Sequence, residues 1–412
     1  MTASAPLLIF IITYLLIAVQ PVRFLHLNRP AASLLGAVAM VVLGRLPLAE
    51  AYAAIDLDVL VFLLGLMILV GYLEEGGFFE AAAEWLLERV TTPRKLLVGV
   101  VVGSGLLSAL FVNDTICLVV TPVLVATIGS LGVRPAPYLI ALAMGANVGS
   151  VLAFTGNPQN MLIGLWSGIP FAQFTVHMLP VVAGALVLTC GVLLAIYRQE
   201  LSRPFPRRAE LPLVMVDRSL IGTALVLFAA AVVAWLLGAN LPLVAITAGT
   251  LMLALAGRDP APALARVEWS LLLLFGALFV VMRGLERSGA IGFINAEGSH
   301  AVSLGSPWTA ALAVSGVMLT LSNLISNVPA VILWRHVIPD LPHPELMWQL
   351  MAMSATFAGN LLMIGSAANL IVAERAEARG VKLGYGEYAK AGVPVTLLTV
   401  AWGILVLVTL VH

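Results

Sequence analysis

The sequence predicts an all-α polytopic membrane protein with two inverted repeats, about ten crossing helices, two re-entrant hairpins and two broken helices. Composition is the first observation: 61% of the 412 residues are hydrophobic, only 10% are charged, and the mean hydropathy is +1.05. The second is the length of the uncharged segments 1–22 and 135–197. A bilayer about 30 Å thick is crossed by about 20 apolar helical residues. The third observation is an internal repeat.

Net charge and cysteine usage exclude several classes of protein. The net charge is zero, so no basic face is expected for nucleic acid. Cys117 and Cys190 lie in different apolar segments and are predicted to fill the core rather than to form a disulfide or bind a metal. The first 22 residues lack a basic n-region and a clear cleavage site, which favours a retained helix over a signal peptide. The expected partners are the lipid bilayer and a small solute, with no cofactor.

The repeat appears as landmarks that recur in the same order in the two halves of the chain. The pairs are Leu35-Gly36 with Ala248-Gly249, Leu73-Glu74-Glu75 with Leu285-Glu286-Arg287, Asn113-Asp114-Thr115 with Ser326-Asn327-Val328, Asn147 with Asn360, and Gly156 to Asn160 with Gly365 to Asn369. Weak symmetry of this kind is typical of transporters. We therefore predict a first repeat over 1–198, a cytoplasmic linker over 199–217 and a second repeat over 218–412, with scaffold and transport domains interleaved across both.

The elements of each half follow one plan: three crossing helices, an amphipathic segment, a hairpin, a broken helix and a last crossing helix. In the first half they are expected near 5–20, 31–49, 57–73, 78–91, 95–131, 135–168 and 174–197. In the second half they are expected near 219–237, 241–257, 267–285, 290–303, 307–338, 346–374 and 388–411.

Basic residues predict the orientation of the chain in the membrane. If each hairpin enters and leaves on one side, each half crosses five times and the second half is inverted. The loops of one side then hold 17 of the 21 Lys and Arg residues, and the other side holds Arg45, Arg283, Arg287 and Arg335. Because basic loops stay in the cytoplasm, both termini are expected outside and the linker inside a plasma membrane, the inner membrane in a bacterium.

Asp114 is the only charged residue between Lys95 and Arg134, at the midpoint of a segment suited to two half-helices. A carboxylate at that depth is costly and usually marks an ion or proton path. The alternative is a polar N-cap for the second half-helix, and both roles are compatible. The sequence therefore places a hairpin tip at Val112 to Thr115, with a coupling cation near Asp114.

Three further polar segments interrupt apolar stretches of the chain. Thr155 to Asn160 lies in the middle of 135–197, where Gly and Pro free backbone groups that lipid cannot satisfy. Ser326 to Pro329 and Gly365 to Asn369 repeat this arrangement without an acid. A simple proline kink is the alternative for the first break. We expect the helix ends at these interruptions to point toward one common site.

The candidate substrate- and ion-binding residues are the polar and glycine positions of these tips and breaks. They are Asn113, Asp114, Thr115, Gly156, Asn157, Pro158, Asn160, Ser326, Asn327, Gly365, Ser366 and Asn369. Asn147 and Asn360 are either further members of the binding site or residues that hold helices together by hydrogen bonds. No Lys or Arg is expected to line the site.

These motifs resemble the ion transporter superfamily over nearly the whole chain. Phe111 to Pro122, Gly156-Asn157-Pro158-Gln159-Asn160 and Ile325-Ser326-Asn327-Val328-Pro329 are similar to the branch that holds arsenite permeases, NhaD-type sodium/proton antiporters and YbiR-like anion permeases. The resemblance implies a citrate transporter-like domain, an elevator-like motion and a homodimer. The related dicarboxylate carriers have Ser-Asn-Thr at both tips, from which Asn113-Asp114-Thr115 and Ser326-Asn327-Val328 depart.

The predicted function is an ion-coupled secondary transporter of a small inorganic oxyanion or hydroxylated acid, similar to arsenite, with proton or sodium coupling. A Na⁺/H⁺ antiporter and a di- or tricarboxylate symporter are the alternatives, and a channel is a further rival. An enzyme is not predicted, because the membrane segments contain no Ser-His, paired Asp or His-Glu-x-x-His constellation.

Overall fold

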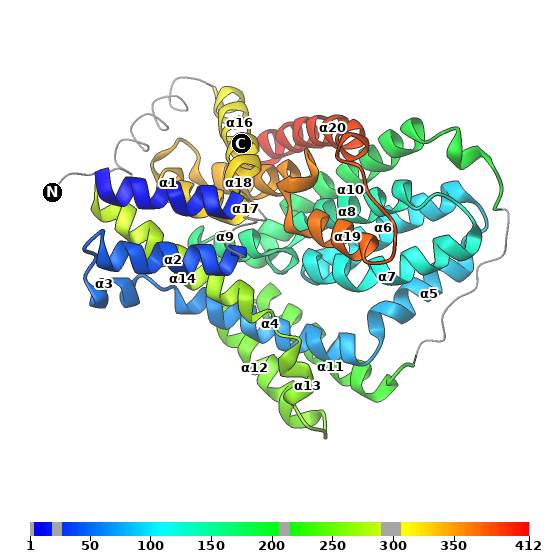
Figure 1. Ribbon diagram of the computed structural model, residues 1–412, viewed down its shortest axis with the longest axis horizontal. Helices are drawn as coiled ribbons and strands as arrows, with labels where there is room; N and C mark the ends of the chain where they lie inside the picture. Colours follow the sequence, from blue (N-terminus) through cyan, green and yellow to red (C-terminus); the bar gives the residue numbers. More distant parts are fainter. Residues whose placement is uncertain (1–3, 19–26, 206–214, 290–305, 412) are drawn as a thin grey trace.

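A computed structural model describes residues 4–18, 27–205, 215–289 and 306–411, and these ranges are helical with no β-strand (Figure 1). The first half contains α1 (Ser4–Ala18), α2 (Arg29–Val42), α3 (Leu48–Ala53), α4 (Leu57–Glu75), α5 (Phe78–Arg89), α6 (Pro93–Leu110), α7 (Asn113–Leu131), α8 (Ala136–Gly149), η1 (Ser150–Leu152), η2 (Phe154–Gly156), α9 (Pro158–Trp166), α10 (Phe171–Ile196) and η3 (Glu200–Ser202).

The second half follows the same order of elements. It contains α11 (Arg218–Leu236), α12 (Leu241–Leu255), α13 (Ala261–Ala265), α14 (Trp269–Arg287), α16 (Pro307–Ile325), α17 (Asn327–Trp334), η4 (Ile338–Asp340), α18 (Pro344–Ala358), η5 (Met363–Gly365), α19 (Ala367–Glu377) and α20 (Tyr385–Val411). The predicted all-α architecture is confirmed. The short helices α3 and α13 were not predicted, and the segment expected near 290–303 lies outside the described residues.

Matched caps show that the two halves use the same local signals. Asn28 accepts a hydrogen bond from the backbone N–H of Ala31 at the start of α2, and Asn240 accepts one from Leu243 at the start of α12. In both helices a proline follows at the second helical position. Such caps satisfy backbone donors that the helix itself leaves free.

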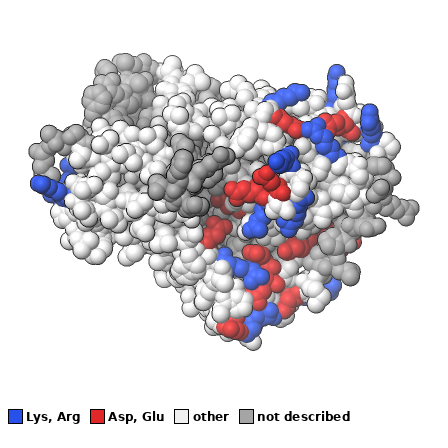
Figure 2. All heavy atoms as spheres, viewed as in Figure 1, with Lys and Arg blue, Asp and Glu red and all other residues white. Residues whose placement is uncertain are grey.

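Eight of the described helices are long and apolar enough to cross a membrane, namely α4, α6, α7, α10, α11, α14, α16 and α20. Figure 2 shows charged side chains gathered over one end of the visible face, whereas the area over α1 and α2 is almost uncharged. A multi-pass membrane protein has this distribution, because uncharged surface faces lipid and charge lies near water.

Helices of the first half pack in pairs against helices of the second half. Helix α2 packs against α14, and α4 packs against α12, so each pair joins one helix from each half. A Cβ atom on Gly65 of α4 would lie 2.3 Å from the carbonyl carbon of Ala245 in α12. That approach requires glycine. Neither half could therefore keep its packing without the other.

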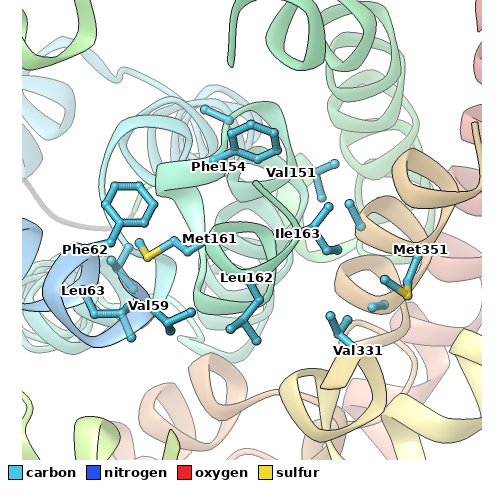
Figure 3. Packing of buried hydrophobic residues seen from close by; sticks show 14 of the residues in the cluster. Val59, Phe62, Leu63, Val151, Phe154, Met161, Leu162, Ile163, Val331 and Met351 are labelled. Atoms are coloured by element: carbon cyan, nitrogen blue, oxygen red, sulfur yellow. The ribbon is translucent and has the colours of Figure 1, made fainter. Parts of the chain in front are cut away.

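A buried core connects these pairs to the broken helices (Figure 3). Val59 and Phe62 of α4 are fully buried beside Met161 and Leu162 of α9, and the cluster continues to Val331 of α17. This core holds the polar segments at fixed positions between apolar helices.

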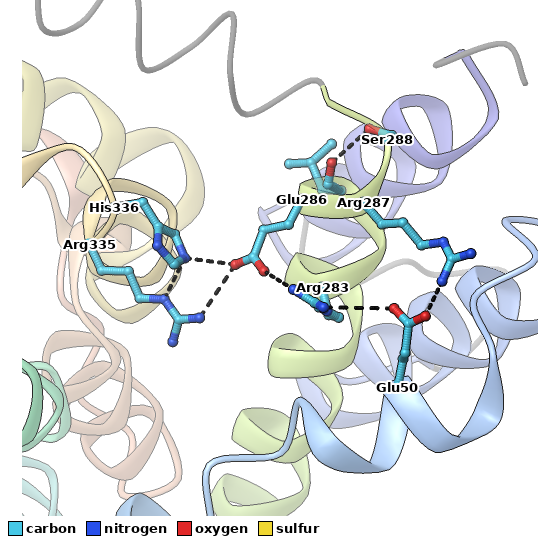
Figure 4. Close-up of polar contacts among 8 residues, drawn as sticks. Glu50, Arg283, Glu286, Arg287, Ser288, Arg335 and His336 are labelled. Carbon is cyan, nitrogen blue, oxygen red and sulfur yellow. Dashed lines mark hydrogen bonds and ion pairs between the residues drawn. The ribbon is translucent and has the colours of Figure 1, made fainter.

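Charge clusters lie at the ends of both helix pairs, with their signs exchanged. At the end of α14, Arg283 and Arg287 pair with Glu50 of α3, as Figure 4 shows. At the end of α4, Glu74 and Glu75 pair instead with Arg266, which follows α13. The charged partners of the long helices thus lie in α3 or directly after α13.

Candidate functional site

The first hairpin is formed by α6 and α7, with the turn at Phe111 and Val112. Asn113 and Asp114 begin α7 and are 4% and 8% exposed. Within the described residues, Asp114 makes neither a hydrogen bond nor an ion pair. The side-chain oxygen of Asn113 is also buried without a hydrogen-bond partner. Two unsatisfied acceptors therefore lie at the tip.

The second tip contains a strained residue. Ser326 joins α16 to α17 with φ of 76° and ψ of 159°, a region that side chains other than glycine rarely adopt. The next residue, Asn327, is 8% exposed. With its nitrogen turned toward them, its amide donates to the carbonyl oxygens of Ala355 (3.1 Å) and Gly365 (3.2 Å). This contact fastens the tip to the second broken helix.

The first break is wider than a proline kink. Two short 3₁₀ turns, η1 and η2, separate α8 from α9, and Asn157 is extended between η2 and α9. Asn157 caps α9 through the N–H of Asn160 (2.8 Å), and its nitrogen donates to the hydroxyl of Ser150 (2.9 Å). A Cβ on Gly156 would lie 2.1 Å from the carbonyl oxygen of Ser150. The break is therefore held by its own side chains.

Both tips and both breaks meet at one cavity of about 210 Å³. Six of the predicted candidates line it: Asn113, Asp114, Pro158, Ser326, Asn327 and Ser366. The structure thus brings together residues that lie up to 253 positions apart in the chain. Asp114 is the only one of the six with a charged side chain.

The other six candidates do not line this cavity: Thr115, Gly156, Asn157, Asn160, Gly365 and Asn369. Several of them shape the breaks instead. Asn160 donates to three backbone oxygens, those of Ser150, Val151 and Ala153. Asn369 donates to the carbonyl oxygens of Gly359 (2.6 Å) and Leu362 (3.3 Å).

Asn147 lies at the centre of a buried amide network. Its oxygen accepts from Asn113 (2.9 Å) and from the hydroxyl of Ser366 (3.2 Å). Its nitrogen donates to Asn360 (2.9 Å) and Asn369 (3.0 Å). The sequence left open whether Asn147 packs helices together or belongs to the site. In the structure it does both, because it links helices and also contacts two residues of the cavity wall.

The cavity also contains polar residues that sequence reasoning missed: Arg29, Gln159, Glu268 and Ser270. The expectation that no basic residue lines the site was wrong, because Arg29, the first residue of α2, reaches it. Gln159 lies within the quoted Gly-Asn-Pro-Gln-Asn motif and donates to the hydroxyl of Thr356 (3.0 Å). Glu268 occupies the position before α14 that Asp56 occupies before α4. Comparison of the two repeats could therefore have identified Glu268 as a conspicuous acidic position.

Comparisons with known proteins agree with this architecture. A family model described as a citrate transporter matches residues 14–356. The silicon efflux transporter LSI3 of Oryza sativa subsp. japonica is 31% identical, over 94% of this chain and 94% of that protein. The inner membrane protein YbiR of Escherichia coli strain K12 is 31% identical over 87% and 89%. The putative transporter arsB of Dictyostelium discoideum is 22% identical over 94% and 88%.

Among solved structures, the YdaH transporter of Alcanivorax borkumensis superposes with a TM-score of 0.58 over 91% of this chain and 89% of that chain, at 16% identity. That likeness shows the fold alone. Apolar helices around a cavity with charged and polar side chains in its wall, together with relatives named as transporters, define a multi-pass secondary transporter. The chain belongs to the citrate transporter family of the ion transporter superfamily.

Proposed function

We propose that this transporter moves a small inorganic oxyanion or hydroxylated acid, similar to arsenite or silicic acid, with a proton or sodium ion as the coupling cation. The observation that carries the proposal is the cavity in which Asp114 lies beside the neutral residues Asn113, Ser326, Asn327 and Ser366. A carboxylate without a partner binds a cation or a proton. Amide and hydroxyl groups donate to and accept from a hydroxylated solute. The names of the silicon efflux transporter and of the arsB relative support this class of solute.

The motion that we propose is of the elevator type, with hairpins that enter and leave the membrane on one side. The moving part would contain the two hairpins and the two broken helices, and the scaffold would contain the α2–α14 and α4–α12 pairs. Arg29 lies at the start of α2 and Glu268 directly before α14, and the distribution of basic loops assigns both helix ends to the cytoplasmic side. The cavity would therefore open toward the cytoplasm. A homodimer in the plasma membrane, with both termini outside, belongs to the same proposal.

Two alternative functions each have one observation in their favour. The unpartnered carboxylate of Asp114 favours a Na⁺/H⁺ antiporter, which needs no other solute. The description of the matching family favours a di- or tricarboxylate symporter. Arg29 would suit its anionic substrate.

Counterflow in proteoliposomes separates these functions. Vesicles loaded with unlabelled arsenite, silicate or citrate should accumulate the matching labelled solute transiently, for arsenite or silicate but not for citrate. Accumulation of citrate alone would favour the symporter. Sodium-driven proton movement without counterflow of any solute would favour the antiporter, and single-channel currents would indicate a channel.

A further inference from the structure

The cavity holds charges from helices that pack in two different sets. Arg29 begins α2, and Glu268 directly precedes α14, the helix against which α2 packs. Asp114 lies on α7, which packs instead against α19. All three charged residues line the cavity, and Arg29 is the only basic residue among the described residues that line it.

Arg29 and Asp114 interact through their charges without direct contact. No hydrogen bond or ion pair joins them within the described residues, yet the two opposite charges line the same cavity and attract each other across it. Asp114 and Glu268 are the acids that line the cavity together with Arg29 among the described residues. A movement of α2 and α14 relative to α7 would therefore make or break a pair between Arg29 and Asp114.

We propose that Arg29 is a tethered counter-ion that pairs with Asp114 while no coupling cation is bound and turns to the solute once a cation occupies Asp114. This inference rests on the proposed function, and it adds the residue that makes solute binding depend on the cation. A cation on Asp114 repels the guanidinium, which then loses Asp114 as its partner. A free guanidinium presents paired N–H donors that fit an oxyanion or its hydroxyl oxygens.

The first test follows cation binding alone and needs no solute. The purified full-length protein is unfolded thermally in detergent while sodium chloride replaces choline chloride at constant ionic strength, and in a second series while the pH is varied. Arg29→Gln removes the competitor, so the sodium concentration for half-maximal stabilisation should fall about fivefold or more, or the pH midpoint should rise. Arg29→Lys keeps the charge and should resemble the wild type.

Matched variants assign the effect to the pair. In an Asp114→Asn background, Arg29→Gln should change neither titration, because the shared partner is gone. Arg218→Gln, which removes an exposed arginine at the start of α11, should leave both titrations unchanged. If Arg29→Gln titrates as the wild type does, or if it shifts the titrations equally without Asp114, the inference is overturned.

The second test adds arsenite, silicate or citrate as a probe and measures its affinity with and without sodium or at two pH values. In the wild type the cation should strengthen binding, and in Arg29→Gln binding should be weak and nearly independent of the cation. If the wild type transports none of the three probes, the proposed function fails while the cation titrations still decide the role of Arg29. If a probe is transported and Arg29→Gln keeps full cation dependence, only the inference about Arg29 fails.

Discussion

Asn147 shows how one buried amide can serve both structure and site. Its oxygen and nitrogen together satisfy Asn113, Ser366, Asn360 and Asn369. Sequence alone identified its match with Asn360 but could not separate a packing role from a binding role. The distinction depends on which side chains surround the amide, and those come from distant segments.

Replacing Asn147 should therefore cost more than removing an ordinary hydrogen bond. Asn147→Leu leaves four buried polar groups without this partner, so we expect the free energy of unfolding to fall by at least about 2 kcal/mol. Asn240→Leu, which removes the exposed cap of α12, should cost about 1 kcal/mol. Denaturant unfolding in detergent measures both, and a smaller loss for Asn147→Leu than for Asn240→Leu would contradict the network's importance.

Ser326 holds a backbone conformation that glycine adopts more readily, with φ of 76°. Ser326→Gly should therefore stabilise the fold by about 1 kcal/mol. Because the hydroxyl lines the cavity, the same change should weaken solute binding. The control is Ala230→Gly in α11, which should destabilise by about 1 kcal/mol. If Ser326→Gly destabilises as Ala230→Gly does, the conformation is not strained.

The residues that sequence reasoning found and missed differ in one physical respect. Asp114 was found because a single charge inside an apolar segment is visible without any tertiary information. Arg29 and Glu268 begin or precede helices, where charged residues are common, so their position in the chain predicts exposure. Only the packing of α2 and α14 beside the hairpin tips turns these residues into the cavity.

At the scale of elements, close packing of α6 and α8 fixes the first hairpin against the first broken helix. A Cβ on Gly149 would lie 2.0 Å from the carbonyl oxygen of Gly105, and one on Gly145 would lie 2.4 Å from the hydroxyl of Ser104. Gly145 and Gly149 thus form a Gly-xxx-Gly spacing that allows close helix contact.

Gly149→Ala should force α6 and α8 apart and destabilise the protein by about 1–3 kcal/mol. Gly191→Ala is the matched control, because it also lies inside a helix but has no atom within 4 Å of the added Cβ. The control should be neutral or stabilising by up to about 1 kcal/mol. Thermal unfolding of the two variants is the measurement, and equal stability would show that the contact can relax.

The start of α11 should respond to acid. The backbone N–H of Leu220, followed by the guanidinium of Arg258, lowers the pKa of Asp217 below its ordinary value of 3.8. The ionised carboxylate therefore stabilises the folded state above that ordinary value, and this contribution disappears as the pH falls through the lowered pKa. Asp217→Asn, which retains a capping side chain, should lose less stability than the wild type between about pH 5 and about pH 3. An identical acid dependence would rule out this contribution.

The long helices were predicted within a few residues because each has an apolar segment bounded by caps, glycines or charges, as at Asp56 and Gly76 around α4. The short helices α3 and α13 were missed because six and five residues carry no measurable periodicity. Both are defined by tertiary contacts, in which Glu50 of α3 meets the arginines of α14.

At the scale of the whole molecule, the described elements recur in one order, and helices from one half pack against helices from the other. The sequence predicted this recurrence from matched landmarks. It could not predict that α2 would pack against α14 or that α4 would pack against α12, since such pairing depends on complementary surfaces. The inversion of the second half stays a prediction.

Cysteine labelling tests that inversion. In a background without Cys117 and Cys190, Arg203→Cys in the linker should resist an impermeant thiol reagent applied to intact cells, because the basic loops lie inside. A cysteine added after His412 should react, and both sites should react after the membrane is permeabilised. The reverse pattern in intact cells would contradict the predicted orientation, and equal access at both positions would contradict five crossings in the second half.

We propose that cation and solute are divided between two tips that meet in one cavity, with Asp114 on one tip and Asn327 on the other. The most direct measurement is the affinity for arsenite or silicate, over a series of sodium concentrations and pH values, in Asp114→Asn and Asn327→Ala. Asp114→Asn should keep an affinity that no longer changes with the cation. Asn327→Ala should bind the solute weakly and retain the wild-type cation dependence. Loss of the cation dependence in Asn327→Ala, together with its retention in Asp114→Asn, would contradict this account.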